Sequence, residues 1–243
     1  MKALLSFFTA LPVGNASLEE TALEIRLLPL VGLVTGLPGA LLLLSAYVLP
    51  PGVAATLALG AVLLAAGLHH ADGVLDVGDA LMAHGGPDRR REVLSDARVG
   101  VGGLGALFVV YAPVLAALAA LCADSPGLAA LTLLGGEVAS RSAMLLTLAF
   151  GEPADARSSS VPFVKALSGP RLTGAVAVAL LAPLPFLLAT STLAPLAILT
   201  APLVAWGAIR IATIRFGGIG GDVVGASGEA CRAALLVLLS ATT

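Results

Sequence analysis

The sequence predicts an all-α, polytopic helical integral membrane protein: a single transmembrane domain with six to seven transmembrane helices. Of its 243 residues, 58% are hydrophobic and only 12% are charged, whereas soluble domains are about 25% charged. The mean hydropathy is +1.01. Aromatic residues are few, and the many Gly and Ala residues suit helices that pack closely against each other in lipid.

Residues 1–26 precede the first long apolar stretch and predict an interfacial N-terminal segment. The first 17 residues resemble a signal peptide, with a Lys, a short apolar run and small residues. A cleaved signal peptide is therefore one interpretation. Because the apolar run is only about ten residues long, we instead expect an uncleaved helix at the membrane interface. In that helix Phe7 and Phe8 would be buried and Pro12 would end it.

Six apolar stretches are each close to the roughly 20 residues that a helix needs to cross a bilayer. They lie near 27–49, 52–68, 102–122, 127–149, 172–190 and 193–213. A seventh, from Arg232 to the end of the chain, has only about half of that length. We expect it to insert partway, or to be a shortened last helix.

The basic residues predict how these spans are oriented. The turns at 50–52, 124–127 and 190–192 contain no Lys or Arg, and all thirteen Lys and Arg fall on the side of the other connections. The positive-inside rule makes that side cytoplasmic. The long segment 67–101 lies on the same side, so any site within it is predicted to face the cytoplasm at the cell membrane.

Residues 67–101 hold the densest charge of the chain. Two short helices are predicted there, with two facing rows of carboxylates at helical spacing: Asp72, Asp76 and Asp79, then, after a Gly-Gly-Pro break, Asp88, Glu92 and Asp96. Like charges at this spacing weaken a helix, whereas a divalent cation reverses that effect. Hard oxygen ligands favour Mg²⁺, Mn²⁺ or Ca²⁺. The alternative is a solvated acidic loop that its own arginines neutralise.

Three further features carry charge or glycine. Glu137 and Arg141 are four residues apart in the fourth span. They either form a structural ion pair, or Arg141 binds a phosphate group of the substrate. The polar loop 151–170 is either a phosphate-binding lid or a solvated loop. The Gly-rich segment 216–229 surrounds Asp222 and either lets the backbone approach a ligand or packs helices. On the cytoplasmic side, Asp222 becomes a candidate ligand or substrate contact.

Several motifs carry a resemblance to one known family. They are FFTALP at Phe7–Pro12, a G-x-x-H-x-D-G-x-x-D-x-x-D pattern at Gly67–Asp79, the residues Glu92, Asp96, Arg98 and Gly100, and the Gly-rich run from Gly217 to Glu229. With these motifs the chain resembles the adenosylcobinamide-GDP ribazoletransferase, or cobalamin synthase, family. Ala10, Ala80 and Gly220 depart from the Arg, Gly and Thr that are usual there.

The resemblance implies a transferase of cobalamin biosynthesis. It would move the cobinamide phosphoryl group of adenosylcobinamide-GDP to α-ribazole or its 5′-phosphate, and GMP would leave. Mg²⁺, with Mn²⁺ as a substitute, would bridge the diphosphate. The residues that we expect to serve this reaction are Asp72, Asp76, Asp79 and Asp96 for the metal, Asp96, Glu92 and Arg98 for catalysis, and His70, Arg141 and Asp222 for substrate binding. Asp96 or Glu92 would be the base.

Two other classes of protein remain open. A CDP-alcohol phosphotransferase-like lipid enzyme uses a similar acidic arrangement, here Asp76-x-x-Asp79 and Glu92-x-x-x-Asp96. A cation-coupled transporter would carry acids midway across its spans, whereas these acids cluster near span ends and in a connection. We expect the lipid bilayer as surroundings and no nucleic-acid partner. The small-residue helix faces allow a homo-oligomer but do not specify one.

Overall fold

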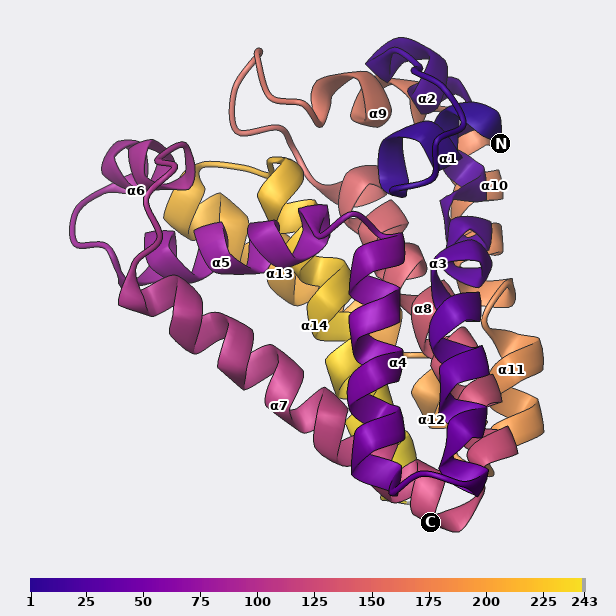
Figure 1. Cartoon of the computed structure of the whole chain (residues 1–243). Coiled ribbons are helices and arrows are strands. Elements are labelled where there is room, and N and C mark those ends of the chain that lie inside the picture. The colour runs from indigo at the N-terminus through magenta and orange to yellow at the C-terminus, as the bar shows by residue number, and fades with distance from the viewer. Residues whose placement is uncertain (242–243) are drawn as a thin grey trace.

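Helices joined by short connections make up the computed structural model, which describes residues 1–241 (Figure 1). In chain order they are α1 (Lys2–Phe8), α2 (Leu18–Glu24), η1 (Ile25–Leu27), α3 (Leu28–Leu43), η2 (Leu44–Tyr47), α4 (Pro51–Ala65), α5 (His69–Met82), α6 (Pro87–Leu94), α7 (Val101–Asp124), α8 (Pro126–Phe150), α9 (Val161–Ala166), α10 (Pro170–Leu181), α11 (Leu184–Thr190), α12 (Ala194–Ala197), α13 (Thr200–Phe216) and α14 (Gly221–Ser240). The described residues form no β-strand, and one isolated bridge pairs Pro153 with Ile219. The all-α prediction is confirmed.

Within residues 1–241, six helical segments are each long and apolar enough to cross a membrane, or seven with one bent pair, so the chain is a multi-pass membrane protein. The six are Leu18–Tyr47, Val101–Asp124, Pro126–Phe150, Pro170–Thr190, Ala194–Phe216 and Gly221–Ser240. Five of these overlap predicted spans. The predicted span at 52–68 and the predicted short last segment differ from the structure.

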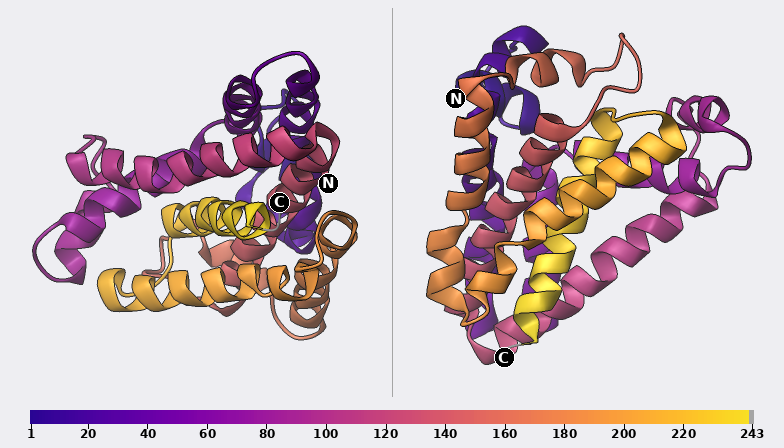
Figure 2. Two further views of the ribbon diagram at one scale, coloured as in Figure 1. Left: turned by 90° about the horizontal axis from the view of Figure 1, so that it is seen from below. Right: turned by 180° about the vertical axis from the view of Figure 1, so that it is seen from behind.

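Helix α8 is the most buried of the six and packs against α3, α10, α11, α13 and α14. Helix α14 lies between α7 and α13 (Figure 2). Helix α5 runs across one end of the bundle, together with α1, α2, α6 and α9, and α14 ends at the opposite end (Figure 1). Polar side chains of the 67–101 segment therefore gather at one end of the molecule.

The predicted span at 52–68 is instead a short helix, α4, followed by a sharp turn. Gly67 and Leu68 both adopt left-handed backbone angles, with φ of 73° and 63°. The chain turns by 94° there, and α5 begins at His69. Fifteen residues of α4 are short for a span by themselves, but α4 and α5 together are long and apolar enough for a seventh, broken span or a re-entrant pair. The predicted span at 52–68 thus corresponds to the first half of a bent pair, whose second half, α5, lies across the end of the bundle (Figure 1).

The prediction of a short, half-inserted last segment is wrong, because α14 has 20 residues and passes the length test for a span. The Gly-rich segment is a turn followed by the first half of α14. A Cβ on Gly228 would lie 2.8 Å from Met144 of α8, so this glycine lets two helices pack closely. Arg232, which we expected on the cytoplasmic side, is fully buried in α14.

The N-terminal segment is helical, as predicted, but its helix ends before Pro12. Helix α1 stops at Phe8, and the hydroxyl of Thr9 donates to the Leu5 carbonyl and accepts from Leu11 N–H at 3.2 Å. Phe8 is buried as expected, whereas Phe7 keeps 38% of its surface exposed. The exposed ring faces a cavity described below.

Glycines bring α5 close to both α7 and α14. A Cβ on Gly103 of α7 would lie 2.7 Å from the Leu75 carbonyl, and one on Gly73 would lie 2.7 Å from the Asp222 carbonyl. Real Cβ atoms do not approach this closely, so the two contacts depend on glycine. They hold α5 between two spanning helices.

Gly103→Ala should therefore lower the stability of the protein in detergent by about 1–3 kcal/mol, because α5 must move away from α7. Gly105→Ala is the matched control in the same helix, since nothing lies within 4 Å of its Cβ position. It should be neutral or stabilise by up to about 1 kcal/mol through helix propensity. Thermal unfolding of the two variants checks this, and equal effects would contradict the proposed contact.

Candidate active site

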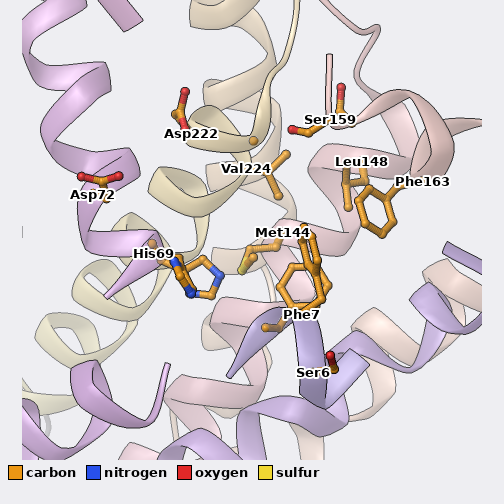
Figure 3. Close-up of a pocket in the computed structure, with 14 residues that line it drawn as sticks. Ser6, Phe7, His69, Asp72, Met144, Leu148, Ser159, Phe163, Asp222 and Val224 are labelled. Carbon is orange, nitrogen blue, oxygen red and sulfur yellow. The ribbon is translucent and has the colours of Figure 1, made fainter. Parts of the chain in front are cut away.

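A cavity of about 480 Å³ lies at the end of the bundle that α5 crosses (Figure 3). Its walls come from α1, α5, α8, α9, the start of α14 and the loop that precedes α9. Figure 3 shows Asp72 and Asp222 on one side and Phe7 and Phe163 on the other, with Met144 between them. The cavity thus has an acidic end and an aromatic end.

The acidic end depends on the contact between α5 and α14. Because Gly73 touches the backbone of Asp222, the carboxylate of Asp222 joins those of Asp72 and Asp76. Partial burial and the neighbouring carboxylates of Asp72, Asp222 and Asp79 raise the pKa of Asp76 to about 6. These carboxylates repel each other when ionised, and a bound cation would stabilise their ionised forms.

Asp79, the third predicted ligand on α5, has a structural role. Its carboxylate accepts hydrogen bonds from the backbone N–H of Gly100 at 2.7 Å and of Gly103 at 2.8 Å. The residue at the start of α7 provides no side-chain cap. Asp79 therefore caps α7 from a neighbouring helix.

The second acidic row does not face the first. Glu92, in α6, is exposed and pairs with Arg89 at 2.7 Å. Asp96 lies beyond the end of α6 and binds Arg98 through both of its oxygens. Hydrogen bonds from Arg98 lower the pKa of Asp96 to about 2. These pairings match the alternative in which arginines neutralise the acidic segment.

No three His, Cys, Asp or Glu side chains within residues 1–241 are close enough together to hold a metal ion. The donor chemistry of Asp72, Asp76 and Asp222 nevertheless fits a hard cation. Mg²⁺ commonly binds one or two carboxylates and takes its other ligands from substrate phosphates and water. The predicted metal set, with Asp79 and Asp96, stays a prediction.

His70 lies in the cavity wall with only 6% of its surface exposed. Its Nδ1 atom has no hydrogen-bond partner in the described part of the chain. Burial, followed by the charges of Arg141, Arg232 and His69, lowers the pKa of His70 well below its usual value. The ring is therefore neutral at physiological pH, and its unpaired Nδ1 atom is closed off from solvent.

Arg141 does not line this cavity but belongs to a buried ion network across α3, α7, α8 and α14. Glu137 binds Arg232 at 2.7 Å and Arg141 at 3.5 Å, and accepts a hydrogen bond from Thr35. Arg232 also pairs with Glu229, which accepts a hydrogen bond from Tyr111. The two carboxylates and two guanidinium groups balance in charge. This agrees with the interpretation of Glu137 and Arg141 as a structural ion pair. A phosphate contact of Arg141 stays a prediction.

The loop before α9 is tied down rather than free. Ala154 N–H donates to the Ile219 carbonyl at 3.0 Å, and Ile219 N–H donates to the Glu152 carbonyl at 2.8 Å. This pairing holds Ser159 and Ser160 against the start of α14, in the cavity wall. Helix α9 then brings Phe163 to the aromatic end. We missed Phe163 from the sequence because it lies in a stretch that looked like a polar loop.

The family model described as cobalamin-5-phosphate synthase matches residues 1–240 of the chain. The chain belongs to the cobalamin-5-phosphate synthase family. Similar proteins named adenosylcobinamide-GDP ribazoletransferase come from Pyrobaculum islandicum, 34% identical over 100% of this chain and 96% of its relative, and Methanosarcina barkeri, 30% identical over 98% and 90%. A Saccharolobus islandicus protein of the same name is 43% identical over 48% of this chain and 47% of its own length. No solved structure matches the chain.

The match to the family model confirms the family predicted from the sequence motifs. It also favours a transferase over a transporter. Of the predicted site residues, Asp72 and Asp222 lie at the acidic end of the cavity, His70 lies in the cavity wall, and Asp76 lies beside the first two.

Measurements of protein stability should distinguish Asp79, which caps α7, from the other carboxylates of α5. Asp79→Asn replaces one acceptor oxygen by an NH₂ group and should cost about 1–3 kcal/mol, because a backbone N–H of α7 loses its partner. Asp72→Asn, the control on the same helix face, should change stability by less than about 0.5 kcal/mol. Chemical unfolding in detergent, without added metal, measures both. An equal loss for the two would contradict the capping role of Asp79.

The ion network should matter far more for stability than the surface pairs. Arg232→Met leaves Glu137 and Glu229 with an uncompensated buried charge and should cost about 3–5 kcal/mol. Arg89→Met breaks an ion pair whose side chains are more than half exposed, and should cost about 0–1 kcal/mol. Thermal inactivation and unfolding compare them. A similar small loss for both would show that the network does not hold the helices.

Proposed function

We propose that this chain is a Mg²⁺-dependent phosphotransferase that uses adenosylcobinamide-GDP as donor and α-ribazole or its 5′-phosphate as acceptor, in the last steps of cobalamin biosynthesis. The family match over residues 1–240 supports this, as do the relatives named adenosylcobinamide-GDP ribazoletransferase. The observation that carries the site is that Asp72 and Asp222 line one end of the cavity, with the carboxylate of Asp76 near enough to feel the charge of both.

In the proposed reaction a ribose hydroxyl oxygen of the acceptor forms a bond to the cobinamide phosphorus. The phosphorus–oxygen bond to GMP breaks, GMP leaves with the bonding electrons, and the hydroxyl proton passes to a base. Mg²⁺, held by Asp72, Asp76 and Asp222, would neutralise charge on the diphosphate. Exposed Asp72 and half-buried Asp76 leave room for phosphate oxygens beside them.

The identity of the base stays a prediction, with Asp96 and Glu92 as candidates. The pairing of Asp96 with Arg98 and its pKa of about 2 make this carboxylate a weak proton acceptor as it stands. The exposed guanidinium of Arg98 can contact phosphate oxygens only after its ion pair with Asp96 breaks. Glu92 is held less firmly, since both it and Arg89 are largely exposed.

We further propose that the end of the molecule with α5 faces the cytoplasm and that the protein lies in the cell membrane. The clusters of Lys and Arg at that end, against the basic-free turns at 50–52 and 124–127, support this orientation. Both substrates are soluble nucleotides, so a cytoplasmic opening suits them. The lipid bilayer surrounds the spans, and a homo-oligomer stays a prediction.

The test is release of GMP by purified protein in liposomes, with adenosylcobinamide-GDP and α-ribazole phosphate, with and without Mg²⁺. Asp72→Asn and Asp222→Asn should lose about 100-fold or more in kcat, because the charge on the diphosphate is less well neutralised. Asp124→Asn, at the far end of α7, is the control and should keep full activity.

Two outcomes would contradict the proposal. Full turnover in a chelator excludes the metal, and the absence of turnover by folded, Mg²⁺-loaded protein excludes the reaction. For the base, Asp96→Asn should lose about 10²–10⁴-fold if Asp96 accepts the proton. Activity close to that of the wild-type protein would remove it from the candidates.

A further inference from the structure

A second, small pocket lies where α2 and η1 meet α9 and the start of α10 (Figure 1). Its volume is about 130 Å³, and it shares no lining residue with the large cavity. Five of its lining residues are apolar, and the other two are Arg26 and Arg171. Pockets that enclose a drug-sized ligand measure about 300–1,000 Å³, so this one suits a small charged group rather than a whole nucleotide.

The charge of the two arginines is not neutralised by the protein. Arg26 and Arg171 are exposed, and no carboxylate lines the pocket. Of the acids on nearby α2, Glu20 accepts a hydrogen bond within its own capping box, Glu24 pairs with the amino terminus, and Glu19 is exposed. The arginines that form ion pairs within residues 1–241 are Arg89, Arg91, Arg98, Arg141 and Arg232. Two free guanidinium groups in one pocket favour an anion, and phosphate above all.

The pocket lies at the boundary of the membrane. Arg171 is the second residue of the spanning segment Pro170–Thr190. Arg26 precedes the start of α3 by two residues, and η1, which contains it, packs against α10. Both side chains therefore lie at the ends of spanning helices, where lipid headgroups are found.

Exposed apolar side chains continue from each arginine along its helix. On α3, Leu30 lies one turn beyond Arg26, and Leu37 follows on the same face, with 37% and 51% of their surfaces exposed. On α10, Val178 lies two turns beyond Arg171 on the same face and is partly exposed. A ligand with a phosphate and acyl chains can contact the pocket and both apolar faces, whereas a soluble phosphate can contact the pocket alone.

We propose that this pocket binds the phosphate of an anionic phospholipid, with Arg26 and Arg171 on the phosphate and the acyl chains along α3 and α10. Basic pockets between spanning helices recognise anionic headgroups in this way. A zwitterionic headgroup fits less well, because the two arginines would repel its cation. The inference goes beyond the proposed function and does not depend on it.

The experiment is native mass spectrometry of the purified full-length chain in detergent, titrated with phosphatidylglycerol or phosphatidylcholine. The first phosphatidylglycerol should bind about tenfold or more tightly than the first phosphatidylcholine. Arg26→Gln combined with Arg171→Gln should weaken binding of phosphatidylglycerol about 30-fold, or about fivefold for each arginine.

Arg210→Gln combined with Arg215→Gln is the matched control. It removes the same charge from two exposed arginines of α13 that do not line the pocket. This control should change the affinity for phosphatidylglycerol by less than about twofold, because the headgroup would not contact α13.

A thermal measurement shows whether the lipid acts through the pocket. Phosphatidylglycerol should raise the Tm of the wild-type protein and of the α13 control, but not that of the Arg26 and Arg171 double variant. If this double variant fails to fold, each single variant decides the question by its expected fivefold loss, about that of one surface arginine.

Three results would overturn the inference. Equal affinities of the wild-type protein for the two lipids would exclude selection of an anionic headgroup. Equal losses in the two double variants would show attraction to the whole charged surface instead of a site. Displacement of the lipid by an excess of inorganic phosphate or of the deacylated headgroup, glycerophosphoglycerol, would assign the pocket to a soluble phosphate.

Discussion

The structure depends on the close packing of α5 between α7 and α14. Gly73 and Gly103 allow two spanning helices to touch the backbone of a helix that lies across the end of the bundle. One contact brings Asp222 to Asp72 and Asp76, and the other lets Asp79 cap α7. A side chain at either glycine would separate the acidic end of the cavity from the helices that support it.

Pairing of charge inside the bundle is the second constraint. Glu137, Arg141, Glu229 and Arg232 are almost fully buried, and an unpaired charge in that position would be very costly. Their network ties α8 to α14 and so fixes the helix that carries Asp222. The buried ion network thus helps to position Asp222, although none of its four charged residues lines the cavity.

The sequence alone was sufficient for the fold class, most of the spans and the family. Composition and span length need no tertiary information, and the Gly67–Asp79 motif is specific. The bend after α4 and the full length of α14 were missed. Left-handed angles at Leu68, and a buried arginine paired with acids from other helices, depend on tertiary contacts that a linear pattern does not contain.

The candidate site was predictable only in part. Helical spacing placed Asp72, Asp76 and Asp79 on one helix, but the same spacing could not show that Asp79 is bound by backbone N–H groups. It also suggested a facing row at Glu92 and Asp96, whose arginine partners are three and two residues away in the chain. The aromatic end was not foreseen, since Phe7 and Phe163 are more than 150 residues apart and meet through folding.

We propose that carboxylates from α5 and α14 together bind a divalent cation and the diphosphate of the substrate. Electron paramagnetic resonance of Mn²⁺ in the presence of GDP tests it most directly, because it needs neither the acceptor nor turnover. We predict bound Mn²⁺ in the wild-type protein and its loss in both Asp72→Asn and Asp222→Asn. If Asp222→Asn still bound Mn²⁺ and Asp96→Asn did not, this prediction would be contradicted. The metal ligands would then lie within the 67–101 segment alone.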